Sequence, residues 1–397
     1  MSVPRLEDLA GLDGARILLR LDLNVPVAGG EVRDETRITA ALPTVRWLLD
    51  RAGVVAACSH LGKAAGTPDP AYSLRPVAAA LERALGRPVR FVEDCVGPPV
   101  AEAAAGAGGE LILLENLRFH AGEKANDAAF ARELAAPFSH YVNDAFGTAH
   151  RAHASVAAAA GLFPPGRRAA GRLMEAEIAA LRRVVDDPDQ PFVAVVGGAK
   201  ISTKTAPLEA LLGKVRTLII GGGMANTFLL AEGHEVGRSL VEEAMAETAR
   251  DVIARARERG IELLLPEDLV VADDLDHPSR VEVVPANRIP ADLMAVDLGP
   301  AARERCKQVL ASARTVFWNG PMGVFERAPF AAGTLAVARA MADCDGFTVV
   351  GGGESVMAVH RAGVADRLSH VSTGGGASLQ LVAGGPLPAV EALEVSR

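Results

Sequence analysis

The sequence predicts an α/β protein made of two doubly wound domains, each a parallel sheet covered by helices. Short apolar runs alternate with helix-like segments along almost the whole chain, which is typical of βαβ units and of sheets buried on both faces. The chain has 397 residues and is too long for one ordinary core. Its residues are 49% hydrophobic but only 4% aromatic, which suits helices packed closely on aliphatic strands.

The first half contains apolar runs with the length of strands, separated by segments with helical character. The strands expected here are Ile17–Leu21, Val54–Cys58, Val89–Val92, Leu111–Leu114 and His140–Val142. The helices expected between them include Pro43–Arg51, Pro76–Leu85 and Asp127–Ala135.

The second half repeats this alternation after a turn-rich segment, GLFPPGRR, at residues 161–168. Its expected strands are Phe192–Val196, Thr217–Ile220, Ile261–Leu265, Thr315–Trp318 and Phe347–Val350. Apolar residues from Leu173 to Val185 have helical spacing, which predicts a connecting helix that stops near Asp187–Pro188. We therefore divide the chain into a domain at 1–170, a connecting helix at 171–188 and a second domain from 189.

Composition excludes several classes of protein. The formal net charge of −8 argues against broad nucleic-acid binding, which needs a large cationic surface. The cysteines are widely spaced without a CxxC pair, so the spacing suggests neither a zinc site nor a disulfide framework. No apolar run reaches the ~18 residues of a membrane span, and the N-terminus lacks a signal-like apolar stretch. We expect a soluble protein of the cytoplasm that does not act at a membrane.

Glycine-rich loops follow the strands of the second half. They read VAVVGGAK (193–200), LIIGGGMAN (218–226), VFWNGPMG (316–323), TVVGGGES (348–355) and HVSTGGGAS (370–378). Glycine lets backbone N–H groups approach a ligand, and a following helix adds its positive dipole end. At the carboxyl edge of a parallel sheet, this pattern predicts a nucleotide or polyphosphate site. Tight turns alone would explain one such loop, but their recurrence favours anion binding.

Two common nucleotide fingerprints are missing from these loops. None spells GxGxxG, which disfavours a dinucleotide-dependent oxidoreductase, and none spells GxxxxGK[ST], which disfavours a P-loop enzyme. The segment GGAKISTK instead carries Lys200 and Lys204, four residues apart. On a helix start they would project from one face, one toward a transferred phosphate and one toward the remaining phosphates. A solvated lysine pair is the alternative, and the neighbouring glycines disfavour it.

Basic residues gather near the strand ends of the first half. We call Arg37, His60, Lys63, Arg118 and Arg151 the cationic cluster. Asp22 and Asn24 lie at the end of the first strand and would form hydrogen bonds to polar groups of the ligand. Guanidinium groups match phosphate and carboxylate oxygens bidentately, so a small acid carrying both groups fits. A metal site made of Asp144, His150 and His153 is not favoured, because its ligand set is incomplete.

Taken together, these segments closely resemble phosphoglycerate kinase over essentially the whole chain and in the family's order. The matching motifs are RLDLNVP, DETRI, SHLGK, YSLRPVA, LLENLRFH, VNDAFGTAHRAHAS, VVGGAKISTK, IIGGGMANTFL, LPEDLVVAD, WNGPMGVFE, VVGGGES and HVSTGGGAS. The resemblance implies a hinge helix between the domains, with a cleft between them. It implies 3-phosphoglycerate or 1,3-bisphosphoglycerate on the first domain, and ATP or ADP with Mg²⁺ on the second. It also implies a monomer of central carbon metabolism, a second domain ending at 376, and a segment at 377–397 that returns to the first domain.

The resemblance also assigns residues to roles. Those that would contact the phosphoglycerate are Asp22, Leu23, Asn24, Arg37, His60, Leu61, Gly62, Lys63, Arg118 and Arg151. Those that would bind the nucleotide are Lys200, Lys204, Gly221, Gly222, Asn319, Glu326, Gly352, Gly353, Glu354 and Ser355, with Glu354 on the metal. Those that would act directly in catalysis are Arg37, Lys200, Gly353 and Gly374. No general base is expected, because the acceptor carboxylate is already ionised and the chemistry reduces to alignment and charge stabilisation.

The sequence departs from the family pattern at a few positions. The family's SHLGR reads SHLGK, which places a point charge at Lys63, and the usual aspartate after GGG is Glu354. The family's ASLE reads ASLQ at Gln380. The alternatives to an ordinary phosphoglycerate kinase are a related kinase acting on a different phosphorylated acid and a binding protein that kept the fold without turnover.

Overall fold

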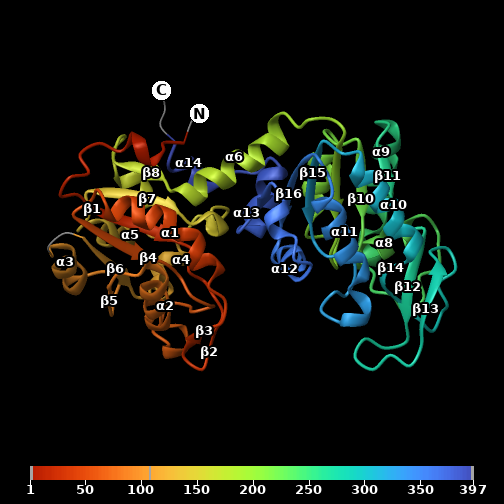
Figure 1. Cartoon of the computed structure of the whole chain (residues 1–397), viewed down its shortest axis with the longest axis horizontal. Helices are drawn as coiled ribbons and strands as arrows, with labels where there is room; N and C mark the ends of the chain where they lie inside the picture. The colour runs from red at the N-terminus through yellow and green to blue at the C-terminus, as the bar shows by residue number, and fades with distance from the viewer. Residues whose placement is uncertain (1–2, 107–108, 395–397) are drawn as a thin grey trace. The chain divides into compact units, whose positions relative to one another are not determined.

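The computed structural model describes residues 3–106 and 109–394, and its elements are labelled in Figure 1. The chain divides into two compact units, of which the first comprises Met1–Ile178 with Pro386–Arg397 and the second Ala179–Gly385. Each unit contains one six-stranded sheet whose neighbouring strands are all parallel. The predicted class of two parallel-sheet α/β domains is confirmed.

The sheet of the first unit has the strand order β5-β6-β4-β1-β7-β8. Its strands are β1 Arg16–Leu21, β4 Val54–Cys58, β5 Val89–Val92, β6 Glu110–Leu114, β7 His140–Asp144 and β8 Arg168–Ala170. A short hairpin is formed by β2 Val27–Ala28 and β3 Glu31–Val32. The helices are α1 Thr36–Leu49, α2 Arg75–Leu85, α3 Pro98–Ala104, α4 Ala121–Lys124, α5 Ala128–Ala135 and α14 Pro388–Glu391. Every residue of β4 and β7 is buried, and since successive side chains point to opposite faces, both faces are covered.

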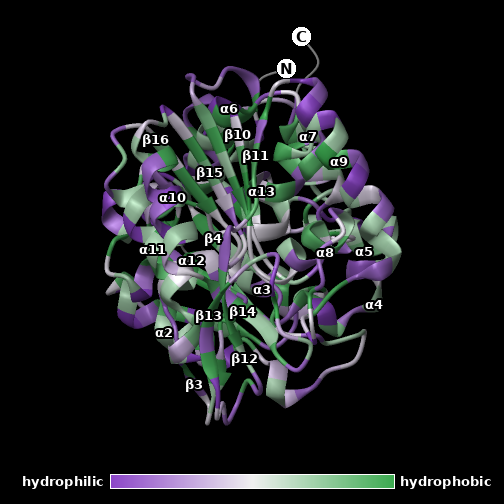
Figure 2. Cartoon of the chain, turned by 90° about the vertical axis from the view of Figure 1, so that its right-hand side faces the viewer, coloured by the Kyte–Doolittle hydropathy of each residue, from purple (hydrophilic) through white to green (hydrophobic). Residues whose placement is uncertain are grey.

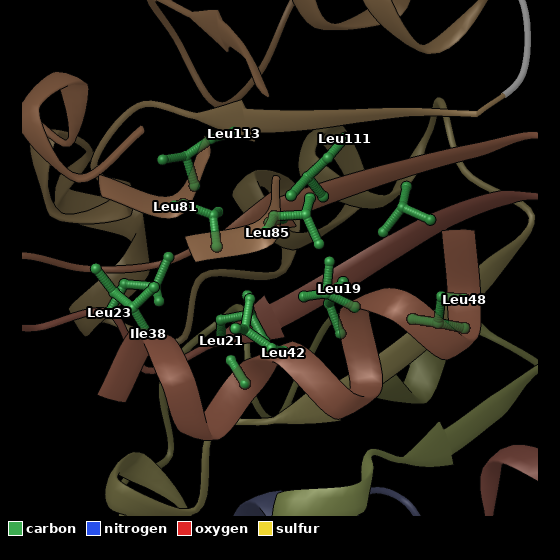
Figure 3. Packing of buried hydrophobic residues seen from close by; sticks show 14 of the residues in the cluster. Leu19, Leu21, Leu23, Ile38, Leu42, Leu48, Leu81, Leu85, Leu111 and Leu113 are labelled. Atoms are coloured by element: carbon green, nitrogen blue, oxygen red, sulfur yellow. The ribbon is translucent and has the colours of Figure 1, made fainter. Parts of the chain in front are cut away.

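One hydrophobic core lies between this sheet and helices α1 and α2. Figure 3 shows Leu21 of β1 beside Leu42 of α1 and Leu23, just after β1, beside Ile38 of α1, and each of these side chains is buried. The core therefore holds the carboxyl end of β1 and the start of α1 together. Asp22 and Asn24 follow β1, and Arg37 of the cationic cluster lies in the first turn of α1.

The sheet of the second unit has the order β11-β10-β9-β15-β16-β17. Its strands are β9 Phe192–Val196, β10 Thr217–Ile220, β11 Glu262–Leu264, β15 Thr315–Asn319, β16 Phe347–Gly351 and β17 His370–Val371. The helices of the unit are α7 Thr205–Leu211, α8 Gly223–Ala231, α9 Ala246–Glu258, α10 Pro300–Ala311, α11 Ala332–Ala342, α12 Gly353–Arg361 and α13 Gly375–Val382. Figure 2 colours the strands largely as hydrophobic and the surrounding helices in alternating bands, as expected of amphipathic helices on a buried sheet.

In chain order, this second sheet runs 3-2-1-4-5-6, the arrangement of doubly wound dinucleotide-binding folds. The direction of winding reverses between β9 and β15. Ligands of open α/β sheets bind outside the carboxyl ends of the strands at such a switch point. The strand order therefore predicts a ligand site at the glycines that follow Val196 of β9 and Asn319 of β15.

Several elements differ from the sequence predictions. Helix α1 begins at Thr36 rather than at Pro43, because Ile38, Ala41 and Leu42 already bury an apolar stripe one turn before the proline. A separate antiparallel sheet of β12 Asp268–Ala272, β13 Val281–Pro285 and β14 Met294–Leu298 was not predicted.

Helix α6 Arg172–Asp186 lies in the segment predicted to connect the domains. The division of the chain into two units falls within this helix, between Ile178 and Ala179. Residues 377–385 group with the second unit rather than with the returning segment, because α13 packs against α7. Residues 386–394 belong to the first unit, where Arg168 donates a hydrogen bond to the Glu394 carbonyl at 3.0 Å. Over the described ranges, we find no helix with the length and apolar character needed to cross a bilayer.

Candidate active site

The loops after β1 and β4 are joined by hydrogen bonds at one edge of the first sheet. The register pairs Arg20 with Cys58, so the residues that follow lie side by side. Leu23 N–H donates to Ser59 Oγ at 2.9 Å, and Gly62 N–H donates to Asn24 Oδ1 at 2.9 Å. The side-chain oxygen of Asn24 is therefore occupied by a hydrogen bond that orders the loop after β4.

Arg37, in the first turn of α1, reaches back to this edge. Its Nη1 donates to Asp22 Oδ2 at 2.8 Å, while about a third of its side chain (34%) remains exposed. The Asp22 side chain is only 9% exposed. The ion pair holds the guanidinium in place and leaves other N–H groups free to meet a ligand, since arginine offers five donors.

Arg118 is the buried member of the cationic cluster. Its side chain lies in the short turn after β6, is 6% exposed, and donates from Nη1 to the Gly62 carbonyl at 2.6 Å. Burial, reinforced by Arg151 and Arg20, lowers its pKa. Within the described part of the chain, the buried Nε has no hydrogen-bond partner. A buried guanidinium with an unpaired N–H and cationic neighbours is costly without an anion, which indicates that this point of the fold receives one.

Arg20 is a functional candidate that the sequence reasoning missed. It is fully buried in β1; its Nε donates to Ser155 Oγ at 2.9 Å, and its Nη2 lies 3.3 Å from His60 Nδ1. Ser155 in turn donates to buried Glu123 at 2.7 Å. Burial lowers the pKa of His60 well below its usual value, and the positive charges of Arg20 and other nearby arginines lower it further. His60 is therefore neutral near pH 7, and its Nδ1 accepts from Arg20. An arginine inside the otherwise apolar strand RILLRL was the available signal.

The remaining predicted residues of this edge divide into exposed cations and buried backbone positions. Lys63 and Arg151 are exposed. The side chains of Leu23 and Leu61 lie in the core, so only their backbone can meet a ligand. Gly62 has φ +63°, and a Cβ there would lie 2.2 Å from the Tyr72 ring, so a side chain at this position has no room.

The metal site considered for Asp144, His150 and His153 does not form. Asp144 accepts a hydrogen bond from Met174 N–H at 2.9 Å, at the start of α6. His153 instead lies 3.9 Å from Glu123, and His150 accepts from Arg151 Nε at 3.2 Å. These side chains are therefore engaged with different partners.

Lys204 forms the centre of the switch point in the second unit. Its ammonium donates to the Gly197 carbonyl at 2.6 Å, to the Asn319 carbonyl at 3.1 Å and to Asn319 Oδ1 at 2.9 Å. Asn319 Nδ2 donates to the Gly351 carbonyl at 3.0 Å, which connects the ends of β15 and β16. Burial lowers the pKa of Lys204 to about 8, and the charge of Glu354 opposes this shift.

The expectation that Lys200 and Lys204 share one helix face is wrong. Helix α7 starts only at Thr205, after a turn, so the two lysines precede it. Lys200 is exposed, whereas Lys204 is drawn inward by carbonyl groups. The two lysines therefore have different surroundings, and Lys200 is the freer of the two to follow a ligand.

Glycines bring the backbone segments of the second edge into close contact. Gly222, which precedes α8, has φ +66°, and a Cβ there would lie 2.7 Å from the backbone N and O of Gly198. Gly221 packs on Met322, where a Cβ would lie 2.1 Å from the methyl carbon. A pocket of about 270 Å³ adjoins these glycines, and its lining includes Gly222, Asn226, Leu240, Val324, Glu326 and Glu354. Apolar walls with a few polar groups suit a flat ring system with polar substituents.

Two helix N-termini adjoin this glycine-rich edge. The starts of α12 and α13 lie close together, since a Cβ on Gly375 would be 2.8 Å from Gly352 Cα. Gly353 and Gly374 are the predicted catalytic glycines of these starts. The backbone N–H groups of a helix start are unpaired within the helix and favour anions.

Ser355 and Glu354, the neighbouring predicted residues, have different environments. The Ser355 hydroxyl is buried and accepts a hydrogen bond from Gly320 N–H at 2.6 Å, so this side chain supports the loop. Glu354 is exposed, and its pKa is raised by partial burial and by the nearby carboxylate of Glu326. A second negative group in this position disfavours the ionised form, and a cation would relieve that cost.

Comparison with known proteins decides the family. The family model described as phosphoglycerate kinase matches residues 6–385. The chain belongs to the phosphoglycerate kinase family. It is 52% identical to the phosphoglycerate kinase of Moorella thermoacetica over 389 residues, with 98% of each chain covered. It is 50% identical to the phosphoglycerate kinase of Desulfosudis oleivorans, with 96% of each chain covered.

Solved structures of the family agree over the same span. The phosphoglycerate kinase structure from Coxiella burnetii matches with a TM-score of 0.89 and 38% identity, covering 99% of each chain. The phosphoglycerate kinase structure from Pyrococcus horikoshii matches with a TM-score of 0.84 and 32% identity, covering 98% of each chain. These comparisons do not favour the alternative acceptor acid that Lys63 suggested.

Proposed function

We propose that this chain catalyses reversible phosphoryl transfer between ATP and the carboxylate of 3-phosphoglycerate, giving ADP and 1,3-bisphosphoglycerate. The observation that carries the proposal is the buried guanidinium of Arg118, whose Nε has no partner in the described chain. A phosphate or carboxylate oxygen supplies what this group lacks. Membership of the phosphoglycerate kinase family supports this acid as the ligand.

The first unit binds the acid. Arg118 and Arg151 hold its anionic groups, and Lys63 adds a mobile charge at the rim. Asp22 and Asn24 orient the loop, and Asp22 accepts from a substrate hydroxyl as well as from Arg37. Neutral His60 offers a hydrogen bond without adding a further charge to the cluster. Backbone groups of Leu23, Leu61 and Gly62 complete the lining.

Arg37 and Lys200 stabilise the phosphoryl group during transfer. Arg37 is held by Asp22 with a third of its side chain exposed, and Lys200 is exposed at the glycine-rich edge. No residue has to remove a proton, because the attacking carboxylate is ionised at neutral pH. Preorganised charges and the helix N-termini at Gly353 and Gly374 lower the barrier by matching the charge of the transition state.

The second unit binds the nucleotide. The apolar pocket beside Gly221 and Gly222 accepts the base, and Glu326 faces the ribose. Lys204, Asn319 and the N–H groups from Gly352 to Ser355 line the path of the phosphates. We propose a monomer of the cytoplasm that acts in glycolysis, with closure through the segment at 171–188 bringing the two substrates together.

Mg²⁺ fits this edge at Glu354. Partial burial and the nearby carboxylate of Glu326 raise the pKa of Glu354, and a cation would offset this cost of holding the ionised form. Mg²⁺ in kinases is commonly bound by one or two carboxylates and by substrate phosphates, so a single protein carboxylate is a sufficient anchor. When bound, the ion neutralises charge on the nucleotide phosphates.

The experiment that tests this proposal measures turnover of 3-phosphoglycerate with MgATP, coupled to reduction of the acyl phosphate product. The wild-type chain should turn over within the usual enzyme range of ~1–10³ s⁻¹. Arg118→Ala should lose about 10²–10³ in kcat/KM, since it removes a preorganised donor. Arg132→Ala is the matched control, because Arg132 is an exposed arginine of α5 in the same unit, and it should behave as wild type. Absence of turnover in the wild-type chain, or equal activity of the two variants, would contradict the proposal.

A further inference from the structure

Asp94, Cys95 and His120 form a second cluster of reactive side chains, none of which has been assigned a role above. Asp94 and Cys95 follow β5, and His120 follows the short turn after β6. Because β5 and β6 are neighbouring parallel strands, these two loops emerge at the same sheet edge. Asp94 and Cys95 are adjacent in the sequence and His120 comes much later, a spacing that matches none of the common metal-binding motifs.

The potential ligand atoms of this cluster converge on one point. One carboxylate oxygen, the Cys95 sulfur and one His120 ring nitrogen all lie within 4.8 Å of one another. His120 Nε2 is 2.8 Å from Asp94 Oδ1. A tetrahedral ion with bonds of about 2.0–2.3 Å separates its ligand atoms by about 3.3–3.8 Å, so adjustments of about 1 Å would close the site.

The ligands are held by supporting contacts of the kind that metal sites use. The Asp94 carboxylate accepts from Cys95 N–H at 2.6 Å, which fixes its direction. The His120 ring stacks on Phe130, with centroids 5.3 Å apart and planes at 26°. The Cys95 side chain is buried, so its sulfur is held in place by the core.

An entry path reaches the cluster from solvent. The side chains of Asp94 and His120 are 44% and 33% exposed. They line a pocket of about 430 Å³ whose other walls include Asp69, Glu115 and the ion pair of Glu93 with Arg75. The carboxylates of this pocket outnumber its one lining arginine, Arg75, and so favour the approach of a cation.

We propose that Asp94, Cys95 and His120 form a binding site for a divalent transition-metal ion of the Zn²⁺ type. One sulfur, one imidazole nitrogen and one carboxylate oxygen are a donor set that Zn²⁺ and Co²⁺ prefer and that Mg²⁺ and Ca²⁺ do not. With three protein ligands, the fourth position is open. The ion joins the loops after β5 and β6, and binding releases the thiol proton of Cys95. This site is independent of the proposed kinase activity.

The experiment is a titration of the chelator-treated, full-length chain with Co²⁺ alone, in the absence of nucleotide. Wild type should develop a thiolate-to-cobalt charge-transfer band that saturates at one equivalent and disappears when Zn²⁺ is added. Glu354 cannot give this band, because it offers oxygen only. Cys95→Ser and His120→Gln should each abolish the band or weaken Co²⁺ binding at least tenfold. Cys344→Ser is the matched control, since Cys344 is a partly exposed thiol of the second unit, and it should keep the band.

Retained turnover of 3-phosphoglycerate by each variant shows that it is folded. Because His120 is partly exposed, His120→Gln keeps the test valid if Cys95→Ser does not fold. The proposal is overturned if wild type gives no band, if His120→Gln gives the band with the Co²⁺ affinity of wild type, or if the band depends on Cys344.

Discussion

Replacing Lys204 with Met should lower the stability of the second unit, in addition to abolishing turnover. In the structure, the ammonium group joins the carbonyl of Gly197 after β9 to both oxygens of Asn319 at the end of β15. These two strands are parallel neighbours, and the winding of the sheet reverses between them. The lysine therefore closes the sheet edge even without a nucleotide, and its loss opens it.

The magnitude follows from the acceptors left behind. Removing the ammonium leaves the Gly197 carbonyl and Asn319 Oδ1, now bonded at 2.6 and 2.9 Å, without this donor, whereas the Asn319 carbonyl still accepts from Gly197 N–H at 3.0 Å. A buried acceptor without a partner costs about 1–3 kcal/mol, although water entering the gap recovers part of this cost. The Met side chain also keeps the apolar contacts of the lysine stem. We therefore expect the unfolding free energy of the second unit to fall by about 2–4 kcal/mol.

The assay is urea unfolding of wild type, Lys204→Met and Lys200→Met, followed by Trp fluorescence, since buried Trp318 next to Asn319 reports on this edge. Lys200→Met is the control for loss of one positive charge, because Lys200 is exposed, and its stability should stay within about 0.5 kcal/mol of wild type. Both variants should lose turnover. Equal midpoints for the two variants would refute the reasoning, because Lys204 would then act only through the nucleotide.

Three further changes test other parts of the structure. Asp297 is 2% exposed, and burial raises its pKa from 3.8 to about 7, so its contribution to stability is present below pH 3.8 and lost as pH rises through 7. The unfolding free energy of Asp297→Asn should therefore exceed that of wild type by up to about 4 kcal/mol at pH 8 and by much less at pH 5. An equal difference in urea unfolding at both pH values would contradict this. Lys63→Arg should raise kcat/KM for 3-phosphoglycerate by up to about tenfold, because a guanidinium fork binds an oxyanion bidentately, and an unchanged value would show that the rim charge is not a direct contact. Glu354→Asp shortens the carboxylate by one methylene and should shift the free Mg²⁺ concentration at half-maximal activity by about tenfold or less, whereas an unchanged Mg²⁺ dependence would remove Glu354 from the metal site.

The sequence was sufficient for the parts of the protein that depend on local pattern. Strands such as Val54–Cys58 and Phe192–Val196 occur with the predicted bounds, because a continuous apolar run between helices has few other stable placements. The glycine-rich loops were recognisable for the same reason, since glycine is needed where backbone segments approach as closely as Gly198 and Gly222 do.

Pattern failed where a local signal had more than one meaning. Pro43 was read as a helix start, although a proline is also accommodated inside a helix when the preceding turn buries apolar residues. The antiparallel sheet of β12, β13 and β14 escaped notice because its edge strand β13 is mostly exposed and lacks a buried apolar run.

The chemical state of the site residues was decided by the tertiary structure alone. The sequence determined which cations this protein has, but burial and neighbours determine what each can do. Arg118 is buried beside other arginines, His60 is kept neutral next to Arg20, and Lys204 is enclosed by carbonyl groups while Lys200 stays exposed. Desolvation and the charge of nearby groups depend on contacts between distant segments, and no local pattern in the sequence encodes them.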